Sequence, residues 1–519
     1  MKKINWLIGL TSLIWLMMGI YGIIFNISFI DEAKYLIKGW LLTTGQVGYY
    51  TTKNFPYQHM PGGFLWYGLG QKLFGPNLLV GRVQSWLVGL VLFYSSYRLS
   101  LKLSGKKGAV ITLMLMGLVP VIAPYYSQVL PQSLSALTLI LGFLYFYDGW
   151  VKENLVSLSW ATVWFSLAFV VRENFLFTLI IYLLLITWKL RNNLKQLIWQ
   201  WMVALVTVGL FMLPGWPGTI KVLKNFPGVG QFLLVSSVEK EVLSLDWKEE
   251  FINDWMLRFR AIVYWGIIFH AWAAAVLVGL WLWWKNKKVK WFQNIRQKGF
   301  VLILLGITLV NTLAHAYSAF KLSPKAIISY SSYVAPLWAV LLGFWLNKLL
   351  KLTSKKKLFL GYILFLPLMI VGIRFCGTSS LEKPWLLEIN QSAERLKPLV
   401  ENYDKIIWLN EPTVFYLVGK VTYYPLINHI NFYKNSNQTK TVRSLGYWNL
   451  EMLDQWFDET DLVVIGDNKI KLLNQSSEGV PVAKFIEKRL TSDFKIKTIR
   501  NDIWPDRITF YEPLAEELK

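Results

Sequence analysis

The sequence of 519 residues is poor in the residues that build disulfides and metal sites. Cys376 is the only cysteine, so neither an intramolecular disulfide nor a thiolate metal cluster can form. The four histidines lie far apart, and none has the spacing of a zinc-binding motif. We expect two of them, His270 and His315, to be hydrogen-bonded inside a helix bundle, since unsatisfied polar groups are costly there.

Acidic residues are missing from three long stretches: no Asp or Glu lies between positions 32 and 148, 173 and 239, or 254 and 382. These gaps coincide with apolar runs. With 54% hydrophobic residues, 27 tryptophans and a mean hydropathy of +0.39, the chain is too apolar for a soluble protein of its length. A transmembrane helix needs about 20 apolar residues. By this test we predict a polytopic α-helical membrane protein with about eleven spans, near 5–29, 78–98, 108–125, 130–147, 155–171, 175–189, 197–214, 259–284, 299–317, 331–348 and 358–375.

The net charge of +23 comes largely from basic connectors between these spans, at 98–107, 189–195, 285–298 and 348–357. With the N-terminus in the cytoplasm, an eleven-span chain places all four connectors inside, as the positive-inside rule requires. We therefore predict a multi-pass plasma membrane protein whose C-terminal part is extracytoplasmic. The charge needs no nucleic-acid partner, and membrane lipids are the partners that it implies.

The chain changes character near residue 378. Short runs typical of β-strands, at 405–409, 462–465 and 508–511, alternate with polar helical stretches. We predict a transmembrane domain at 1–377, with an external loop at 31–77, and a soluble extracytoplasmic α/β domain at 378–519.

The first external loop holds the candidate chemistry. Asp31 and Glu32 follow directly on the first span and are the only acidic residues among the first 147 positions. Carboxylates at a membrane boundary are costly to keep unless they are solvated or used, so this pair either marks the loop start or acts in a site. The rest of the loop is aromatic, glycine-rich and polar. Such side chains suit a sugar-binding site at the interface, although aromatic belts also anchor membrane proteins.

The order of residues in this loop resembles that of the GT-C glycosyltransferases. The pattern consists of Asp31-Glu32-Ala33 with Tyr35, Pro56-Tyr57, His59-Met60-Pro61-Gly62-Gly63, Phe74-Gly75 and Arg82. Protein O-mannosyltransferases and lipid A aminoarabinose transferases are the members that it is most similar to. The resemblance implies inverting transfer of a sugar from a polyprenyl-phosphate donor to a hydroxyl acceptor at the outer face of the membrane. A protein, a lipid and a glycan fit equally well as this acceptor. It also implies that the first acidic residue of the loop, here Asp31, is the general base, and we expect Glu32 to share the catalytic site.

A phosphate leaving group needs cations rather than a general acid. The candidate cations on the predicted outer side are Lys53, Arg172, Lys321 and Lys325, and we place Tyr57, His59 and Tyr330 beside the substrate. Arg172 is followed by Glu173 in a very short connection, so the arginine serves either as a structural ion pair or as a phosphate contact. Lys321 and Lys325 are either ordinary loop lysines or, together, a clamp on the carrier.

The sequence departs from the family pattern after the third span. Where many GT-C members have a second acidic residue, this chain offers Tyr125, Tyr126, Ser127, Gln128 and Gln132. No carboxylate is available there to share a cation. We therefore expect no cofactor and a metal-independent reaction, or one in which Asp31 and Glu32 alone hold an ion.

Two other functions compete with the transferase. A transporter or lipid flippase is expected to show paired repeats, broken helices and charges near the middle of the membrane, and the sequence shows none of these. A non-catalytic scaffold would need only one span as an anchor. Replacing Asp31 separates these hypotheses, because a scaffold would be indifferent to the change.

Overall fold

The structure is a computed structural model that describes residues 2–28, 30–46, 59–118, 125–212, 292, 294–320, 330–349, 383–420, 432, 448–474 and 479–514. These residues form two compact units. The first consists of the residues up to 26, 82–212 and those between 246 and 382. The second joins 27–81 to the chain from 383 onward. The predicted external loop thus belongs to the same unit as the C-terminal domain.

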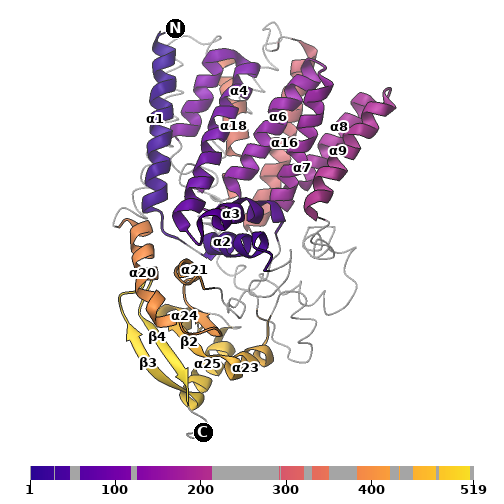
Figure 1. The fold of residues 1–519 in the computed structure, drawn as a ribbon. Coiled ribbons are helices and arrows are strands. Elements are labelled where there is room, and N and C mark those ends of the chain that lie inside the picture. The colour runs from indigo at the N-terminus through magenta and orange to yellow at the C-terminus, as the bar shows by residue number, and fades with distance from the viewer. Residues whose placement is uncertain are drawn as a thin grey trace. The chain divides into compact units, whose positions relative to one another are not determined.

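The first unit is a helical bundle (Figure 1). Its described helices are α1 (Lys2–Phe25), α4 (Leu78–Leu118), α6 (Gln132–Val151), α7 (Leu155–Val171), the 3-10 helix η1 (Glu173–Phe175), α8 (Leu176–Leu190), α9 (Leu194–Met212), α16 (Ile295–Phe320) and α18 (Ala335–Leu349). Within the described part of the chain, six helices are long and apolar enough to cross a membrane, and α7 is a shorter apolar helix. The predicted spans at 259–284 and 358–375 fall outside that part, so the number of about eleven stays a prediction.

Local signals explain the helix boundaries. Gly105 has a φ of 73° and interrupts α4, which accounts for the two spans predicted on either side of it. Asn154 caps α7 by accepting a hydrogen bond from the Ser157 backbone N–H at 3.0 Å. Pairs of polar side chains then join helices inside the bundle, as between Thr178 of α8 and Asn311 of α16 at 2.9 Å. The bundle therefore combines apolar surfaces with interhelical hydrogen bonds.

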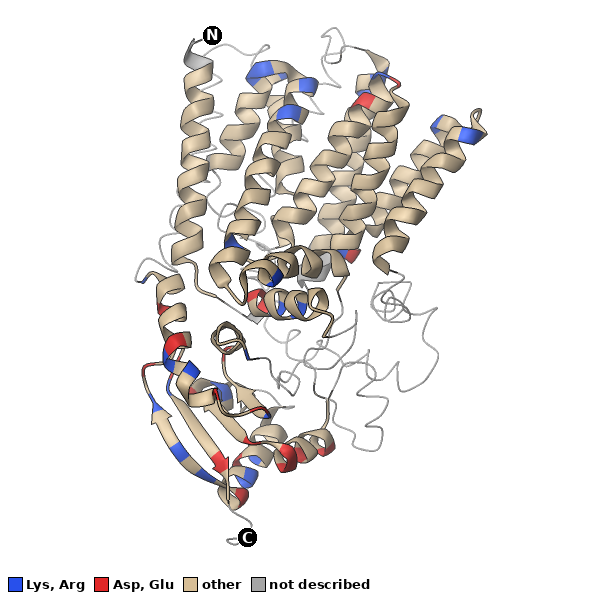
Figure 2. Cartoon of the chain, viewed as in Figure 1, with Lys and Arg blue, Asp and Glu red and all other residues tan. Residues whose placement is uncertain are grey.

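Charged residues gather at one end of the bundle (Figure 2). Lys102 of α4 pairs with Asp148 of α6, and Arg296 of α16 pairs with Glu153 at 2.8 Å. This end carries the connectors at 98–107 and 189–195, which are predicted to lie in the cytoplasm. Which end faces the cytoplasm remains the prediction of the positive-inside rule.

In the second unit, the loop after the first span folds into two helices, α2 (Ile30–Thr43) and α3 (Pro61–Phe74), which pack against each other. They cross at Gly39 and Gly68. A Cβ atom on Gly68 would lie 2.1 Å from the Gly39 carbonyl oxygen, so only glycine permits this approach. Thr43 fastens the crossing by donating a hydrogen bond from Oγ1 to the Gly68 carbonyl at 3.0 Å.

The C-terminal domain is a four-stranded sheet with helices, as predicted. Its elements are α20 (Trp385–Val400), β1 (Ile406–Leu409), α21 (Pro412–Leu417), α23 (Leu450–Glu459), β2 (Leu462–Gly466), α24 (Asp467–Leu473), α25 (Gly479–Asp493), β3 (Phe494–Arg500) and β4 (Ile508–Pro513). The strand order is β1-β2-β4-β3, with β1 parallel to β2 and the other pairs antiparallel. Three of the four strands coincide with the predicted runs. β3 was not predicted, because its residues are mostly exposed and polar and give no strand pattern.

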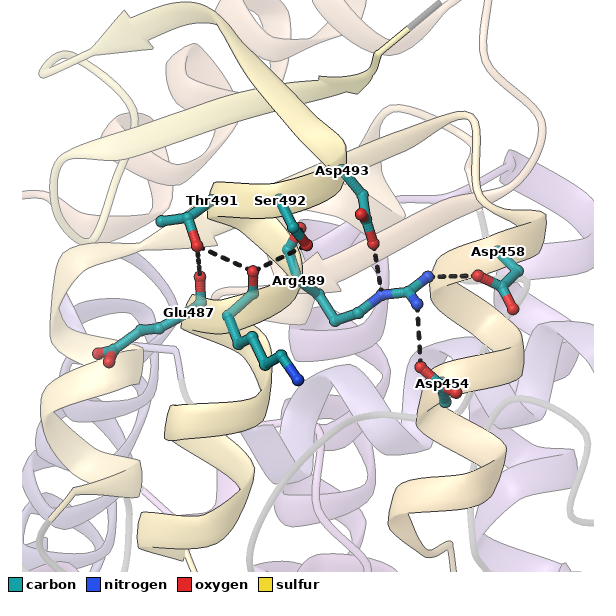
Figure 3. Close-up of polar contacts among 8 residues, drawn as sticks. Asp454, Asp458, Glu487, Arg489, Thr491, Ser492 and Asp493 are labelled. Carbon is teal, nitrogen blue, oxygen red and sulfur yellow. Dashed lines mark hydrogen bonds and ion pairs between the residues drawn. The ribbon is translucent and has the colours of Figure 1, made fainter. Parts of the chain in front are cut away.

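Both faces of the two parallel strands are buried. One face packs against side chains of α23, α24 and α25. On the other, Trp408 of β1 stacks on Phe415 of α21 with ring centroids 4.7 Å apart. Arg489 of α25 ties two of the covering helices together, because it reaches Asp454 at 3.1 Å and Asp458, both on α23, and also Asp493 at 2.9 Å (Figure 3).

Candidate active site

The two catalytic candidates lie in the first turn of α2, but they differ in exposure. The Asp31 side chain is 52% exposed, and its Oδ1 lies 3.2 Å from the Lys34 ammonium one turn later. Glu32 is fully buried. Since adjacent residues of a helix point about 100° apart, one carboxylate faces outward and the other packs inward. Asp31 is thus the accessible carboxylate of the pair.

A buried cation shares this helix. Lys38 follows Asp31 by seven residues, which is about two helical turns, yet it is only 1% exposed. Burial lowers the pKa of Lys38 to about 8. Lys38 was not among the residues predicted for the site. The available signal was its spacing from Asp31 and Lys34, which predicts a common helix face once the segment is recognised as a helix.

The remaining loop residues begin α3. His59 is partly exposed and precedes the extended Met60, after which Pro61 opens the helix. His59 therefore stands at a helix entrance in the same unit as Asp31. Lys53 and Tyr57 lie outside the described residues, so their expected places beside the substrate stay predictions.

The C-terminal domain touches α2 and α3 through α21. Thr413 Oγ1 lies 3.0 Å from Oγ of Ser28, two residues before α2 begins. The hydroxyl of Tyr416 donates a hydrogen bond to Gln71 Oε1 of α3 at 3.1 Å, and its ring meets that of Trp40 of α2 at 6.0 Å. Nothing in the sequence pointed to this contact, because it joins segments more than 300 residues apart.

In the bundle, Arg172 connects α7 to η1 and is only 5% exposed. Its Nη2 donates a hydrogen bond to the Tyr330 hydroxyl at 3.0 Å. The guanidinium also lies 5.6 Å from the ring centre of Tyr330 and 5.8 Å from that of Tyr333. The structure thus brings together two residues that the sequence analysis named separately, Arg172 and Tyr330.

Arg172 keeps both roles considered for it. Its Nε lies 3.8 Å from Glu173 Oε1, which is at the long end of ion-pair distances. His315 completes the surroundings: its ring lies 4.9 Å from that of Tyr333, and its Nδ1 bonds to the Asn311 carbonyl at 2.7 Å. The expected hydrogen bond of His315 inside the bundle is therefore present. Lys321 and Lys325 belong to a stretch that the structure does not describe.

Arg82, the last residue of the loop pattern, is buried and donates a hydrogen bond to the Ile23 carbonyl near the end of α1 at 2.8 Å. It thus satisfies a backbone oxygen in the last helical turn of α1. Among the described residues, no group of three or more His, Cys, Asp or Glu side chains is arranged to hold a metal ion.

Comparisons with known proteins agree with this architecture. Residues 58–216 match the family model described as dolichyl-phosphate-mannose-protein mannosyltransferase. ArnT from Cupriavidus metallidurans, solved with undecaprenyl phosphate, superposes with a TM-score of 0.56 at 10% identity, covering 99% of this chain and 98% of that one. The chain has the GT-C fold. The GT-C resemblance seen in the first loop is thereby confirmed, as is a helical membrane architecture with a C-terminal α/β domain.

A second GT-C structure has the same architecture. The Archaeoglobus fulgidus oligosaccharyltransferase, solved with zinc and sulfate, superposes with a TM-score of 0.55 at 11% identity, covering 92% of this chain and 70% of that one. No curated protein sequence matches the chain. At such low identities the GT-C structures establish the fold, and the roles of individual residues have to be argued from this chain.

Proposed function

We propose that this GT-C protein is a membrane glycosyltransferase that moves a sugar from a polyprenyl-phosphate donor to a hydroxyl acceptor, with inversion at the anomeric carbon. The observation that carries the proposal is the exposed carboxylate of Asp31 in the first turn of α2, beside a fully buried Glu32. A general base has to be within hydrogen-bond reach of the acceptor hydroxyl, and only an accessible carboxylate meets this requirement.

In the proposed reaction, Asp31 takes the proton of the acceptor hydroxyl while the oxygen of that hydroxyl attacks the anomeric carbon. The bond from that carbon to the phosphate oxygen breaks on the opposite face. The leaving group is already an anion, so it needs positive charge rather than a proton. Arg172 suits this role because its planar guanidinium is held by Tyr330 and by the faces of two tyrosine rings.

Several finer features belong to the same proposal. Sugar transfer takes place at the outer face of a plasma membrane, with the N-terminus in the cytoplasm and residues 378–519 outside. We also propose that Lys53, Tyr57, His59, Lys321 and Lys325 contribute to substrate binding. The ammonium group of Lys34 lies 3.2 Å from Asp31 and cannot serve as a ligand for a metal ion. We therefore propose a metal-independent reaction.

The test is transfer of radiolabelled sugar from defined polyprenyl-phosphate donors to membrane extract. Asp31→Asn is compared with Asp404→Asn, a change at a carboxylate whose side chain is 98% exposed in the C-terminal domain. We expect wild type and Asp404→Asn to incorporate label and Asp31→Asn to incorporate none above background. Failure of wild type with every donor would instead favour a transporter or a scaffold.

A further inference from the structure

Glu411, the N-cap residue of α21, brings a carboxylic acid close to α2, the catalytic helix that carries Asp31. Glu411 precedes α21 and caps it, since its Oε1 accepts hydrogen bonds from the Thr413 hydroxyl at 2.9 Å and from the Thr413 backbone N–H at 3.4 Å. The same Thr413 hydroxyl contacts Ser28, just before α2. Glu411 is therefore two hydrogen bonds away from the segment that begins the catalytic helix.

The charges around Glu411 come from both sides of this contact. Glu32 of α2 acts on it as a like charge, and Lys469 of α24 acts on it as an opposite charge. Lys469 in turn is influenced by Lys34, the partner of Asp31. Burial, together with the charge of Glu32, raises the pKa of Glu411 to about 7, and burial lowers the pKa of Lys469.

We propose that Glu411 is a positioning residue of the active site: through Glu32 and the Thr413–Ser28 contact it holds the first turn of α2, so the C-terminal domain sets the placement of Asp31. The proposal rests on the function proposed above. It assigns the C-terminal domain a part in catalysis rather than only in covering the site.

The physical reason is that two nearby carboxyl groups cannot both ionise cheaply. While Glu411 keeps its proton, its carboxyl group and the charge of Glu32 do not repel each other. When Glu411 loses the proton, the repulsion between Glu411 and Glu32 strains the contact of α21 with α2. Asp31 then loses its placement, so kcat falls while the KM for the donor stays nearly constant.

The first test is the pH profile of kcat for wild type, Glu411→Gln and Glu401→Gln. The glutamine at 411 still accepts the Thr413 hydrogen bonds but cannot ionise, and Glu401 is an exposed acid of the same domain. We expect kcat of wild type and Glu401→Gln to fall severalfold as the pH rises through about 7, and kcat of Glu411→Gln to stay level across that range. Identical profiles for all three would overturn the proposal.

The second test needs no activity, so it separates this proposal from the proposed function. A raised pKa means that folding favours neutral Glu411, so its contribution to stability is complete below its ordinary value of about 4.5 and is lost as the pH rises through about 7. In detergent, the full chain with Glu411→Gln should therefore melt at a higher temperature than wild type at pH 8 and at the same temperature at pH 4.5. Replacing Glu32 with glutamine in wild type should move the loss of stability to lower pH, because removing the like charge lowers the pKa of Glu411. If the difference in melting temperature between Glu411→Gln and wild type is the same at every pH, the coupling is refuted, even if sugar transfer is observed.

Discussion

The acidic segment of α2 and the surroundings of Arg172 differ in exposure and in how far apart in the sequence their residues lie. Asp31 lies next to Glu32 in the sequence, and its carboxylate is half exposed beside Lys34. Arg172 is almost fully buried, and its partner Tyr330 is 158 residues away. One group is local and accessible, and the other is shielded and assembled from segments far apart in the sequence.

This difference matches the two tasks of the proposed reaction. A base has to come within hydrogen-bond reach of the incoming acceptor, so it must stay accessible. A cation that binds phosphate gains from being preorganised among fixed dipoles and rings, because its interaction is stronger where water is excluded. The predictions below test this division between an accessible base and a preassembled cation.

The largest effect is expected at Asp31. Asparagine keeps the size and the helix but cannot take a proton, so kcat should fall by about 10²- to 10⁴-fold with little change in the KM for the donor. Glu32→Gln provides the comparison. Because Glu32 is buried, its replacement should lower kcat less than the replacement of Asp31. Steady-state kinetics at saturating acceptor measure both, and equal losses would remove the distinction between the two carboxylates.

The next largest effect is expected at Arg172. The Arg172→Lys substitution keeps the charge next to Glu173 but removes the planar guanidinium and its stacking on Tyr330 and Tyr333. We expect the KM for the donor to rise about 10-fold, which corresponds to about 1.4 kcal/mol. Arg191→Lys, at an exposed arginine that lies over the Trp188 ring, is the matched control and should leave the KM unchanged.

The crossing of α2 and α3 should be sensitive to a single methyl group. A Cβ atom at position 68 would meet the Gly39 carbonyl at 2.1 Å, so Gly68→Ala should destabilise the fold by about 1–3 kcal/mol. Gly306→Ala, in α16, meets nothing within 4 Å and should be neutral or slightly stabilising. Thermal unfolding in detergent compares the two, and equal melting temperatures would show that the close approach is absent.

A smaller effect concerns Lys38. Because burial lowers the pKa of Lys38 to about 8, the unfolded chain binds its proton more tightly, and stability should increase as the pH rises from about 8 to about 10.5. If Lys38 also attracts the donor phosphate, affinity should fall a few-fold over the same rise in pH. Lys38→Met should remove both dependences. A stability profile of Lys38→Met that still rises above pH 8 would assign the titration to another group.

The smallest effect is expected from metal removal. Transfer by wild type should be unchanged by an excess of chelator, since the lysine beside Asp31 already balances its charge. Loss of transfer on chelation and its recovery on adding a divalent cation would show that the two carboxylates hold an ion.

The sequence predicted the fold where the signal was local. Apolar runs located the described helices of the bundle, and β-type runs located β1, β2 and β4, because each pattern depends on neighbours within a few turns or residues. It predicted the external segment only as a loop, although Ile30–Thr43 and Pro61–Phe74 are helical. Its glycine-rich and aromatic composition is not typical of helices. The two helices depend instead on the close Gly39–Gly68 crossing.

For the site, the sequence analysis named Asp31, Arg172 and Tyr330, since their types and positions already suggested chemistry. It did not find Glu411, Thr413 or Tyr416, because contacts across more than 300 residues leave no local pattern in one sequence. Lys38 was missed for a different reason: an amphipathic helix has to be recognised before the face of a lysine can be assigned.

The most direct test of the account is equilibrium binding of undecaprenyl phosphate to purified wild type, Asp31→Asn and Arg172→Lys in detergent. Because the base and the phosphate contact are assigned to different residues, we expect Asp31→Asn to bind the carrier as tightly as wild type. Arg172→Lys should bind it about 10-fold more weakly. Weakened binding by Asp31→Asn together with full affinity in Arg172→Lys would contradict the assignment of the two regions.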